Sequence, residues 1–198
     1  MILNLEDLFT RCGIDSSSSR YKAVSDAWNA LFEKRELAYF NWDKLEDLNF
    51  KDQDILNQNK WNAYKSYAYG YLMNMHAYYD SIPFVINSFF GLTDESRTSW
   101  RIEFINKLSL FVNNSDHKIF RDNESFKTLQ KIVNQWKHRD QMFFNYKMGT
   151  GITLRVGRDS EEDEIDARKF MIEVHDILEP LALKCLVFEL IESNEQLK

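Results

Sequence analysis

Residues 66–92 contain no Lys, Arg or Glu, although 28% of the whole chain is charged. So long a stretch almost without charge can form a membrane span or the buried central helix of a globular protein. Every polar residue within it would be costly in hydrocarbon. The sequence therefore predicts a buried helix over residues 59–91 and no membrane association. The polar residues that decide this are Asn74, His76, Asp80 and Asn87.

Few residues in this chain break helices, since it has only six glycines and two prolines. This scarcity favours long helices over a sandwich of short strands. Pro83 should kink its helix, because it leaves the carbonyl of Tyr79 without its helical donor, and Pro180 should interrupt the last helix. Apolar residues at helical spacing predict the other helices, at about 3–12, 21–40, 98–113, 124–140 and 164–194. A serine of the run 16–19 should cap the second of these.

The period of the pattern changes once, where Ile152, Leu154 and Val156 alternate with polar residues after the turn-forming letters MGTG. This alternation predicts a β-hairpin over about 142–157. We expect residues 41–58 to be a connection with a turn or two of helix, and residues 113–123 to be a connection. The predicted fold class is all-α: one domain over 1–198, a mainly antiparallel helical bundle with a small β-hairpin before the C-terminal helix.

Cysteine usage and charge limit the class of protein further. Cys12 and Cys185 lack CxxC spacing, which predicts two buried, reduced thiols in a cytoplasmic protein. Glu6 and Asp7 near the start argue against a signal peptide. The net charge of −6 excludes a protein built as a whole to coat nucleic acid, so any such contact requires a local basic patch.

A polar stripe runs along the predicted helix of residues 59–91, because His76, Asp80 and Asn87 fall on one face at helical spacing. The residues around it are apolar or aromatic, so we expect the stripe to be buried. Three interpretations are open: a polar network that fixes helix register, a functional pocket, or a metal pair of His76 and Asp80. No third ligand is indicated by spacing, so we assign no metal and no cofactor.

A second group of polar residues lies in the letters NQWKHRD, residues 134–140. Asn134 and His138 share one helix face, with Lys137 and Arg139 beside them. From residue 131 to 158 there are six basic residues and one acid, a local charge of 6 − 1 = +5, opposite in sign to that of the chain. The basic residues beyond the helix are Lys147, Arg155 and Arg158, which with Lys137 are the candidate substrate-binding residues.

This basic segment has two interpretations. It is either a solvated helix border beside a basic hairpin, or a surface for single-stranded nucleic acid or a nucleotide, with aromatic rings at Phe143, Phe144 and Tyr146. The acidic run of residues 159–166 follows directly. That run could mask the basic patch, repel a second acidic molecule, or be a charged loop.

Residues 134–138 (NQWKH) resemble the polar-to-histidine half of the catalytic motif of the HEPN superfamily. Residues 75–92 (MHAYYDSIPFVINSFFGL) are similar to the central helix of HEPN-like bacterial proteins. The resemblance covers about residues 60–190 and implies a helical bundle. For catalytic members it implies metal-independent RNA cleavage, in toxin–antitoxin or phage-defence systems, often as homodimers. Other members are non-catalytic binding or scaffold domains.

If the resemblance extends to catalysis, His138 moves the proton as the ribose 2′-hydroxyl attacks the phosphate. Asn134 then orients the imidazole or the phosphate, and Lys137 or Arg139 stabilises the developing charge. Val133, however, stands where the motif has arginine. The alternative is a non-catalytic module whose hairpin docks an acidic protein partner. We also expect His138 to lie in a groove close to His76 or Asp80, where a carboxylate would raise the pKa of the imidazole.

Overall fold

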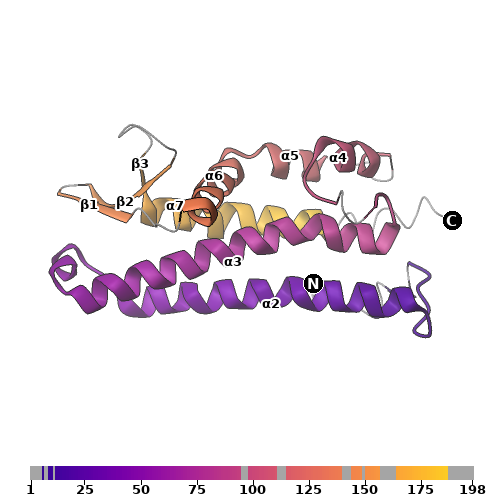
Figure 1. Ribbon diagram of the computed structural model, residues 1–198, viewed down its shortest axis with the longest axis horizontal. Coiled ribbons are helices and arrows are strands. Elements are labelled where there is room, and N and C mark those ends of the chain that lie inside the picture. Colours follow the sequence, from indigo (N-terminus) through magenta and orange to yellow (C-terminus); the bar gives the residue numbers. More distant parts are fainter. Residues whose placement is uncertain are drawn as a thin grey trace. The chain divides into compact units, whose positions relative to one another are not determined.

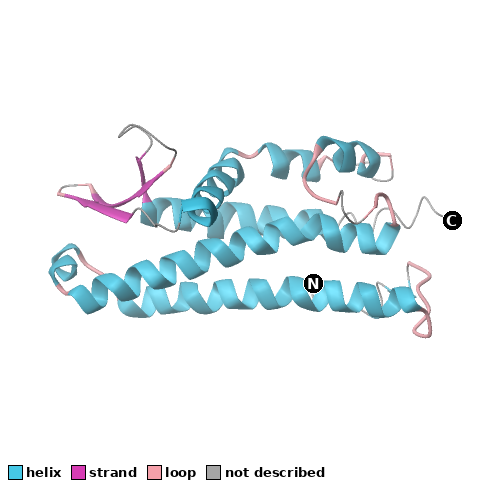
Figure 2. Ribbon diagram, viewed as in Figure 1, coloured by secondary structure: helices cyan, strands magenta, loops and turns pink. Residues whose placement is uncertain are grey.

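The structure, a computed structural model, describes residues 6, 9, 10, 12–94, 98–110, 115–139, 144–148, 150–156 and 164–186, with the side chains of Asp52, His138 and Arg139 excepted. It is rich in helix and contains one small three-stranded antiparallel sheet (Figures 1 and 2). This confirms a helix-rich fold with a small sheet, and the antiparallel bundle remains a prediction. No described helix combines the length and the apolarity that crossing a membrane requires.

The elements follow one another along the chain in a simple order, and residues 6, 9 and 10 before them are helical. The helices up to the sheet are α2 (Ser19–Leu48), the 3₁₀ helix η1 (Asp52–Leu56), α3 (Gln58–Phe90), α4 (Ile102–Leu108), α5 (Asp116–Asp122) and α6 (Glu124–Arg139). The strands are β1 (Phe144–Lys147), β2 (Gly151–Arg155) and β3 (Glu164–Asp166). After them come α7 (Ala167–Glu173), the π-helix η4 (Val174–Leu178) and helical residues 179–186.

Several predicted elements are confirmed. Helix α3 lies within one residue of the expected bounds at each end and continues through Pro83 as one helix. Helix α6 begins at Glu124, as expected. The N-cap of α2 is Ser18, whose Oγ accepts a hydrogen bond of 3.1 Å from the backbone N–H of Tyr21. A serine oxygen in this position satisfies one of the amides that have no partner in the first turn of a helix.

Other boundaries were predicted wrongly. Helix α2 runs to Leu48 and so includes residues 41–48 of the expected connection, whereas η1 is the short helical turn expected within it. Helix α4 begins at Ile102 instead of 98, and the expected connection 113–123 contains α5. The C-terminal helix begins at Ala167, after a strand. Its geometry changes from α-helical to π-helical at η4, so the regular α-helix is interrupted just before Pro180.

The chain forms two compact units, each built from segments that are distant in sequence. Unit 1 contains Met1–Glu33, Tyr78–Asp122 and Glu179–Lys198, and unit 2 contains Lys34–Ala77 and Asn123–Leu178. Both α2 and α3 pass from one unit into the other, because their bounds cross the divisions at 33/34 and 77/78.

The core of unit 1 is aromatic. The ring of Phe9 packs against those of Tyr21 and Phe89, with centroids 4.2 and 5.9 Å apart. Two cations bind backbone carbonyls at and just after the C-terminal end of α3, where the carbonyls of the last helical turn have no helical donors. The guanidinium of Arg20 donates to the carbonyl of Phe89, and the Lys107 ammonium donates to that of Leu92 at 2.9 Å.

The core of unit 2 is also aromatic. The indole of Trp42 stacks on the His175 imidazole with centroids 4.7 Å apart and 8° between the planes, and it also contacts the ring of Tyr71. A second cluster joins Tyr64 to the rings of Phe50, Trp61 and Phe144.

The sheet belongs to unit 2 and has the strand order β1-β2-β3. The predicted hairpin is confirmed, with Phe144 paired to Leu154 and Lys147 paired to Gly151. Gly151 has a φ of +86°, a conformation that L side chains rarely adopt, so glycine is needed at this turn. Strand β3 was not predicted, and it pairs Glu164 with Arg155 across from β2.

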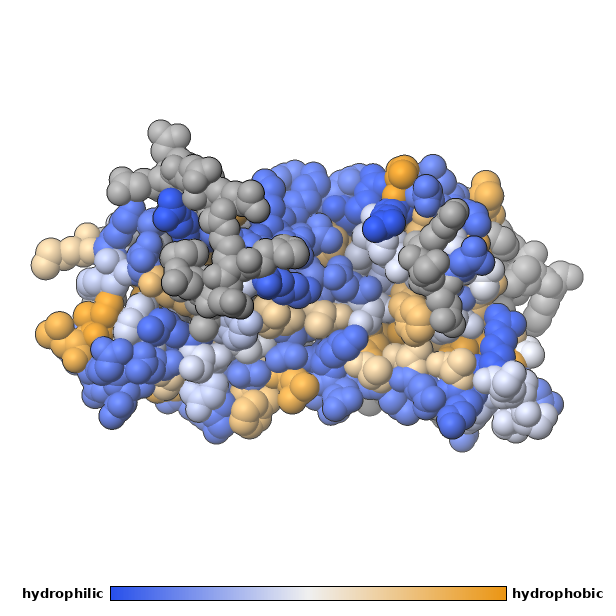
Figure 3. All heavy atoms as spheres, in the orientation of Figure 1, coloured by the Kyte–Doolittle hydropathy of each residue, from blue (hydrophilic) through white to orange (hydrophobic). Residues whose placement is uncertain are grey.

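Most of the surface visible in Figure 3 is hydrophilic, with apolar residues in separate spots. Leu56 and Met148 are the most exposed large apolar side chains among the described residues, at 92% and 94%. Single exposed apolar residues are ordinary on protein surfaces. Of the two cysteines, Cys185 is buried as expected, whereas Cys12 is only partly buried, and neither is joined in a disulfide within the described structure.

Candidate functional site

Helix α6 carries the residues that the sequence singled out, and its apolar side faces the core as predicted. The buried residues on that side are Phe126, Leu129, Ile132, Val133 and Trp136. The side chains of Lys131, Asn134 and Lys137 are exposed, and we refer to these three residues as the α6 outer face. The predicted polar and basic residues of this helix that the structure describes therefore face solvent.

Val133 is fully buried, with no exposed surface. The resemblance noted in the sequence would place the arginine of the HEPN motif at this position, which lies in the core and not on the surface. A guanidinium here would lose its hydration without a partner supplied by the fold, which is strongly unfavourable. The backbones of His138 and Arg139 belong to α6, but their side chains lie outside the described part of the chain, so the predicted groove around His138 stays a prediction.

The basic residues of the hairpin are less available than the sequence suggested. The ammonium of Lys147 forms an ion pair of 2.9 Å with the Glu164 carboxylate, whose side chain is only 10% exposed. That carboxylate also accepts hydrogen bonds from Asn145 at 3.0 Å and from Thr153 at 2.9 Å. The contacts with Lys147, followed by those with Asn145 and Thr153, lower the pKa of Glu164 despite its partial burial.

Glu164 belongs to the acidic run 159–166, so part of that run does neutralise the basic hairpin from within the fold. Of the other hairpin candidates, Arg155 is half-buried on β2, and Arg158 lies outside the described residues. Phe144 is buried in the core against Trp136 and Tyr64, and it is therefore not a surface ring for stacking on a ligand. Phe143 is outside the described residues.

The polar stripe of α3 is only partly buried. His76 is 2% exposed and Asn87 is 5% exposed, as expected, but Asp80 is exposed, so the prediction of a buried carboxylate was wrong. Asn87 has a structural role: its Nδ2 donates to the Thr93 carbonyl at 2.9 Å, and its Oδ1 accepts from the Thr93 amide at 2.8 Å. These bonds fix the chain where it leaves α3.

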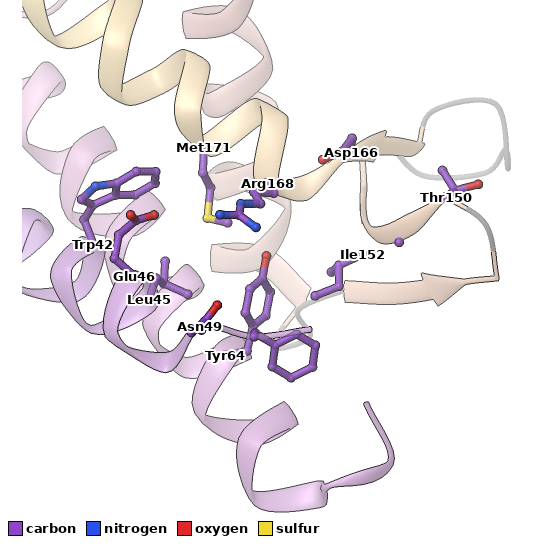
Figure 4. A pocket seen from close by; sticks show the side chains of 12 residues that line it. Trp42, Leu45, Glu46, Asn49, Tyr64, Thr150, Ile152, Asp166, Arg168 and Met171 are labelled. Carbon is purple, nitrogen blue, oxygen red and sulfur yellow. The ribbon is translucent and has the colours of Figure 1, made fainter. Parts of the chain in front are cut away.

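A pocket of about 290 Å³ in unit 2 was not predicted from the sequence (Figure 4). Its walls come from the C-terminal end of α2, from α3, from the hairpin turn and β2, and from the β3–α7 junction. The residues that line it are Trp42, Leu45, Glu46, Asn49, Phe50, Tyr64, Thr150, Gly151, Ile152, Asp166, Arg168 and Met171. No spacing motif joins segments so far apart in sequence, so the sequence carried no signal for this pocket.

Tyr64 is the most unusual residue of this pocket. Its side chain is 6% exposed, and its hydroxyl makes no hydrogen bond with any described residue. Burial raises the pKa of the phenol well above its ordinary value, against an opposing effect of the Arg168 charge. The hydroxyl is therefore a protonated donor that has no acceptor within the described structure. Buried hydroxyls of this kind are uncommon and call for an explanation.

The described residues contain no group of three or more His, Cys, Asp or Glu side chains that could hold a metal ion. The expected pair of His76 and Asp80 thus gains no third ligand within the part of the chain that the structure covers. The pocket and the α6 outer face are the features left to consider for function.

No family model matches the chain, and no curated protein or solved structure matches it at a significant level. The class of protein is therefore defined by its own structure: a helix-rich protein with a small antiparallel sheet, an exposed basic helix face and a mixed polar and aromatic pocket.

Proposed function

We propose that this protein is an RNA-binding domain of the HEPN-like type, which contacts RNA through the α6 outer face and does not cleave it. The observation that carries the proposal is the charge of α6. Helix α6 (Glu124–Arg139) has four basic residues and one acid, a charge of 4 − 1 = +3 in a chain of −6. Lys131 and Lys137 are exposed on this helix, with the Asn134 amide between them.

Lysines spaced along one helix face suit the phosphates of a flexible single strand. Ammonium groups bind phosphates without reading sequence, and an exposed amide can donate to a phosphate or to a base edge. The one described acid of α6, Glu124, lies in its first turn and pairs with Lys127 at 2.7 Å. It therefore leaves Lys131 and Lys137 available for a ligand.

The buried position of Val133 is the reason for proposing binding without cleavage. A catalytic HEPN motif places an arginine charge next to the polar residue, and in this chain a core side chain occupies that place. The alternative of a basic hairpin that docks an acidic protein is less favoured, because the charge of Lys147 is already paired with Glu164.

The test is a titration of fluorescently labelled single-stranded RNA, followed by anisotropy at several salt concentrations. Replacing Lys131 and Lys137 together by Glu should weaken binding of every sequence. Because each phosphate contact to a single strand contributes about 0.7 to the slope of log K against log salt, the slope should fall by roughly 1.4 for two lost contacts. The matched control replaces Lys22 and Lys118, which are exposed in unit 1, by Glu.

Equal binding by the two double variants would overturn the proposed surface. Cleavage is tested separately, by incubating structured and single-stranded RNA with the protein in EDTA. We expect the wild type and His138→Ala to leave the same amount of full-length RNA. Cleavage that depends on His138 would contradict the non-catalytic half of the proposal and leave the binding half standing.

A further inference from the structure

We propose that the pocket of unit 2 binds a free α-amino acid with an apolar side chain, held through both its carboxylate and its ammonium group. This function is separate from RNA binding, because no residue of the α6 outer face lines the pocket. The volume of about 290 Å³ lies at the lower end of the range for ligand sites, which suits a small metabolite.

The carboxylate subsite consists of Tyr64 and Arg168. The Tyr64 hydroxyl points toward the Arg168 side chain in Figure 4, and the guanidinium is close enough to influence the phenol electrostatically. Neither group has a hydrogen bond to a described residue, and the guanidinium makes no ion pair with one. A ligand carboxylate placed between them would accept from both, and charge-assisted bonds of this kind are the strong ones.

The ammonium subsite lies across the pocket, at the C-terminal end of α2 and the residue that follows it. The Glu46 carboxylate and the Asn49 amide oxygen both point into the pocket in Figure 4, and among the described residues no side chain pairs with either. Asp166 also lines the pocket, but its carboxylate caps α7 by accepting from the Lys169 amide at 2.8 Å. Glu46 is therefore the acid available to a ligand cation.

The apolar side chain of the ligand would pack against a rigid apolar surface of the pocket. The Trp42 indole is stacked on His175 and packed against Tyr71, so its position is set before a ligand arrives. Leu45 and Met171 complete the apolar lining on this side. Pre-ordered aromatic and aliphatic surface of this kind binds an apolar side chain at little entropic cost.

The charges of the lining argue against a phosphorylated ligand. One base, Arg168, and two acids, Glu46 and Asp166, give 1 − 2 = −1. A nucleotide or free phosphate would bring further negative charge into this field, whereas a zwitterion places one charge at each subsite.

Calorimetric titration of the full chain tests the proposal with L-leucine, L-methionine and L-phenylalanine as probes. Two ligands that each lack one charged group serve as comparisons: 4-methylpentanoate, which is leucine without its amine, and 3-methylbutylamine, which is leucine without its carboxylate. We expect saturable binding of at least one amino acid, and binding at least about tenfold weaker for both comparison ligands.

Three variants assign the subsites. Tyr64→Phe removes only the hydroxyl and should weaken amino-acid binding by about tenfold or more, and Arg168→Gln should do the same. Glu46→Gln should weaken the amino acid but leave 4-methylpentanoate unchanged. The matched controls, Lys169→Gln and Asp43→Asn, change exposed charges on the same helices outside the pocket and should bind as the wild type does.

The proposal is overturned if no amino acid binds, or if 4-methylpentanoate binds as tightly as leucine. It is also overturned if Tyr64→Phe binds with wild-type affinity. Circular dichroism of each variant distinguishes lost binding from lost folding, and Tyr64→Phe, which keeps the ring in its aromatic cluster, preserves the test if a charge variant fails to fold.

Discussion

The indole N–H of Trp100 donates a hydrogen bond of 2.8 Å to the backbone carbonyl of Tyr79. This is the carbonyl that Pro83 leaves without a helical donor, since proline has no N–H to bond to the residue four positions earlier. A side chain 21 residues away in sequence thus replaces the missing backbone bond. Helix α3 can therefore keep a proline in its buried part without an unpaired carbonyl.

Replacing Trp100 by Phe should show that the role of the Trp100 indole depends on Pro83, which we call the coupling between the two residues. The ring is largely kept but the donor is lost, so we expect a loss of about 1–3 kcal/mol in the free energy of unfolding, measured by urea denaturation. In a Pro83→Ala background the alanine amide can bond to the Tyr79 carbonyl. Trp100→Phe should therefore lower the free energy of unfolding by clearly less in that background. Equal costs in the two backgrounds would contradict the coupling.

Gly70 should resist a substitution that usually stabilises helices. Replacing a glycine in a helix interior by alanine ordinarily gains about 1 kcal/mol. Here a Cβ at Gly70 would collide with the side-chain amide of Asn41, whose Nδ2 also donates to the Leu37 carbonyl at 2.7 Å. We expect Gly70→Ala to leave thermal stability unchanged or to lower it. In an Asn41→Ala background the same substitution should give the usual gain. A full gain in the wild type would show that Asn41 moves away freely.

The Lys147–Glu164 ion pair should make stability depend on pH in the acid range. The pKa of Glu164 is lowered from its ordinary value of 4.5 in the folded state, so its contribution is present above that value and is lost as pH falls through the folded pKa. Compared with Glu164→Gln, the wild type should be more stable by about 1 kcal/mol at pH 7. The difference should shrink steadily in thermal melts as pH falls below about 4.5, because the unfolded state takes up a proton first and the folded state takes one up only below its lowered pKa.

Glu36→Gln, on the exposed side of α2, is the control for a general effect of removing an acid. Its difference from the wild type should change little over the same pH range. A Glu164→Gln difference that stays constant from pH 7 to pH 3 would contradict the role assigned to the ion pair.

Arginine at two adjacent positions of α6 should have very different effects on stability. Val133→Arg buries a charge in the core and should cost roughly 3–5 kcal/mol in the free energy of unfolding or prevent folding. Asn134→Arg, one residue further on the exposed side, should change stability by less than about 0.5 kcal/mol. Chemical denaturation of both variants measures the contrast, and similar stabilities would mean that Val133 is not a core position.

Sequence alone determined the elements whose signals are local. The apolar periodicity of residues 59–91 and 124–140 predicted α3 and α6, because a helix that buries one face must repeat apolar residues at helical spacing. The alternation around Leu154 and the turn at Gly151 predicted the hairpin for the same reason, with a period of two. Ser18 as N-cap also follows from short-range chemistry.

Tertiary structure decided the elements whose partners are distant. The last turns of α2 were predicted as a polar connection, yet they form a helix because Trp42 packs on His175 and Tyr71. Residues 164–166 were predicted as the end of the acidic run and the start of the last helix, but they form strand β3 because Glu164 pairs with a cation and two hydrogen-bond donors on the hairpin. The pocket around Tyr64 had no sequence signal at all, since its walls come from positions 42 to 171 and only the packing of unit 2 brings them together.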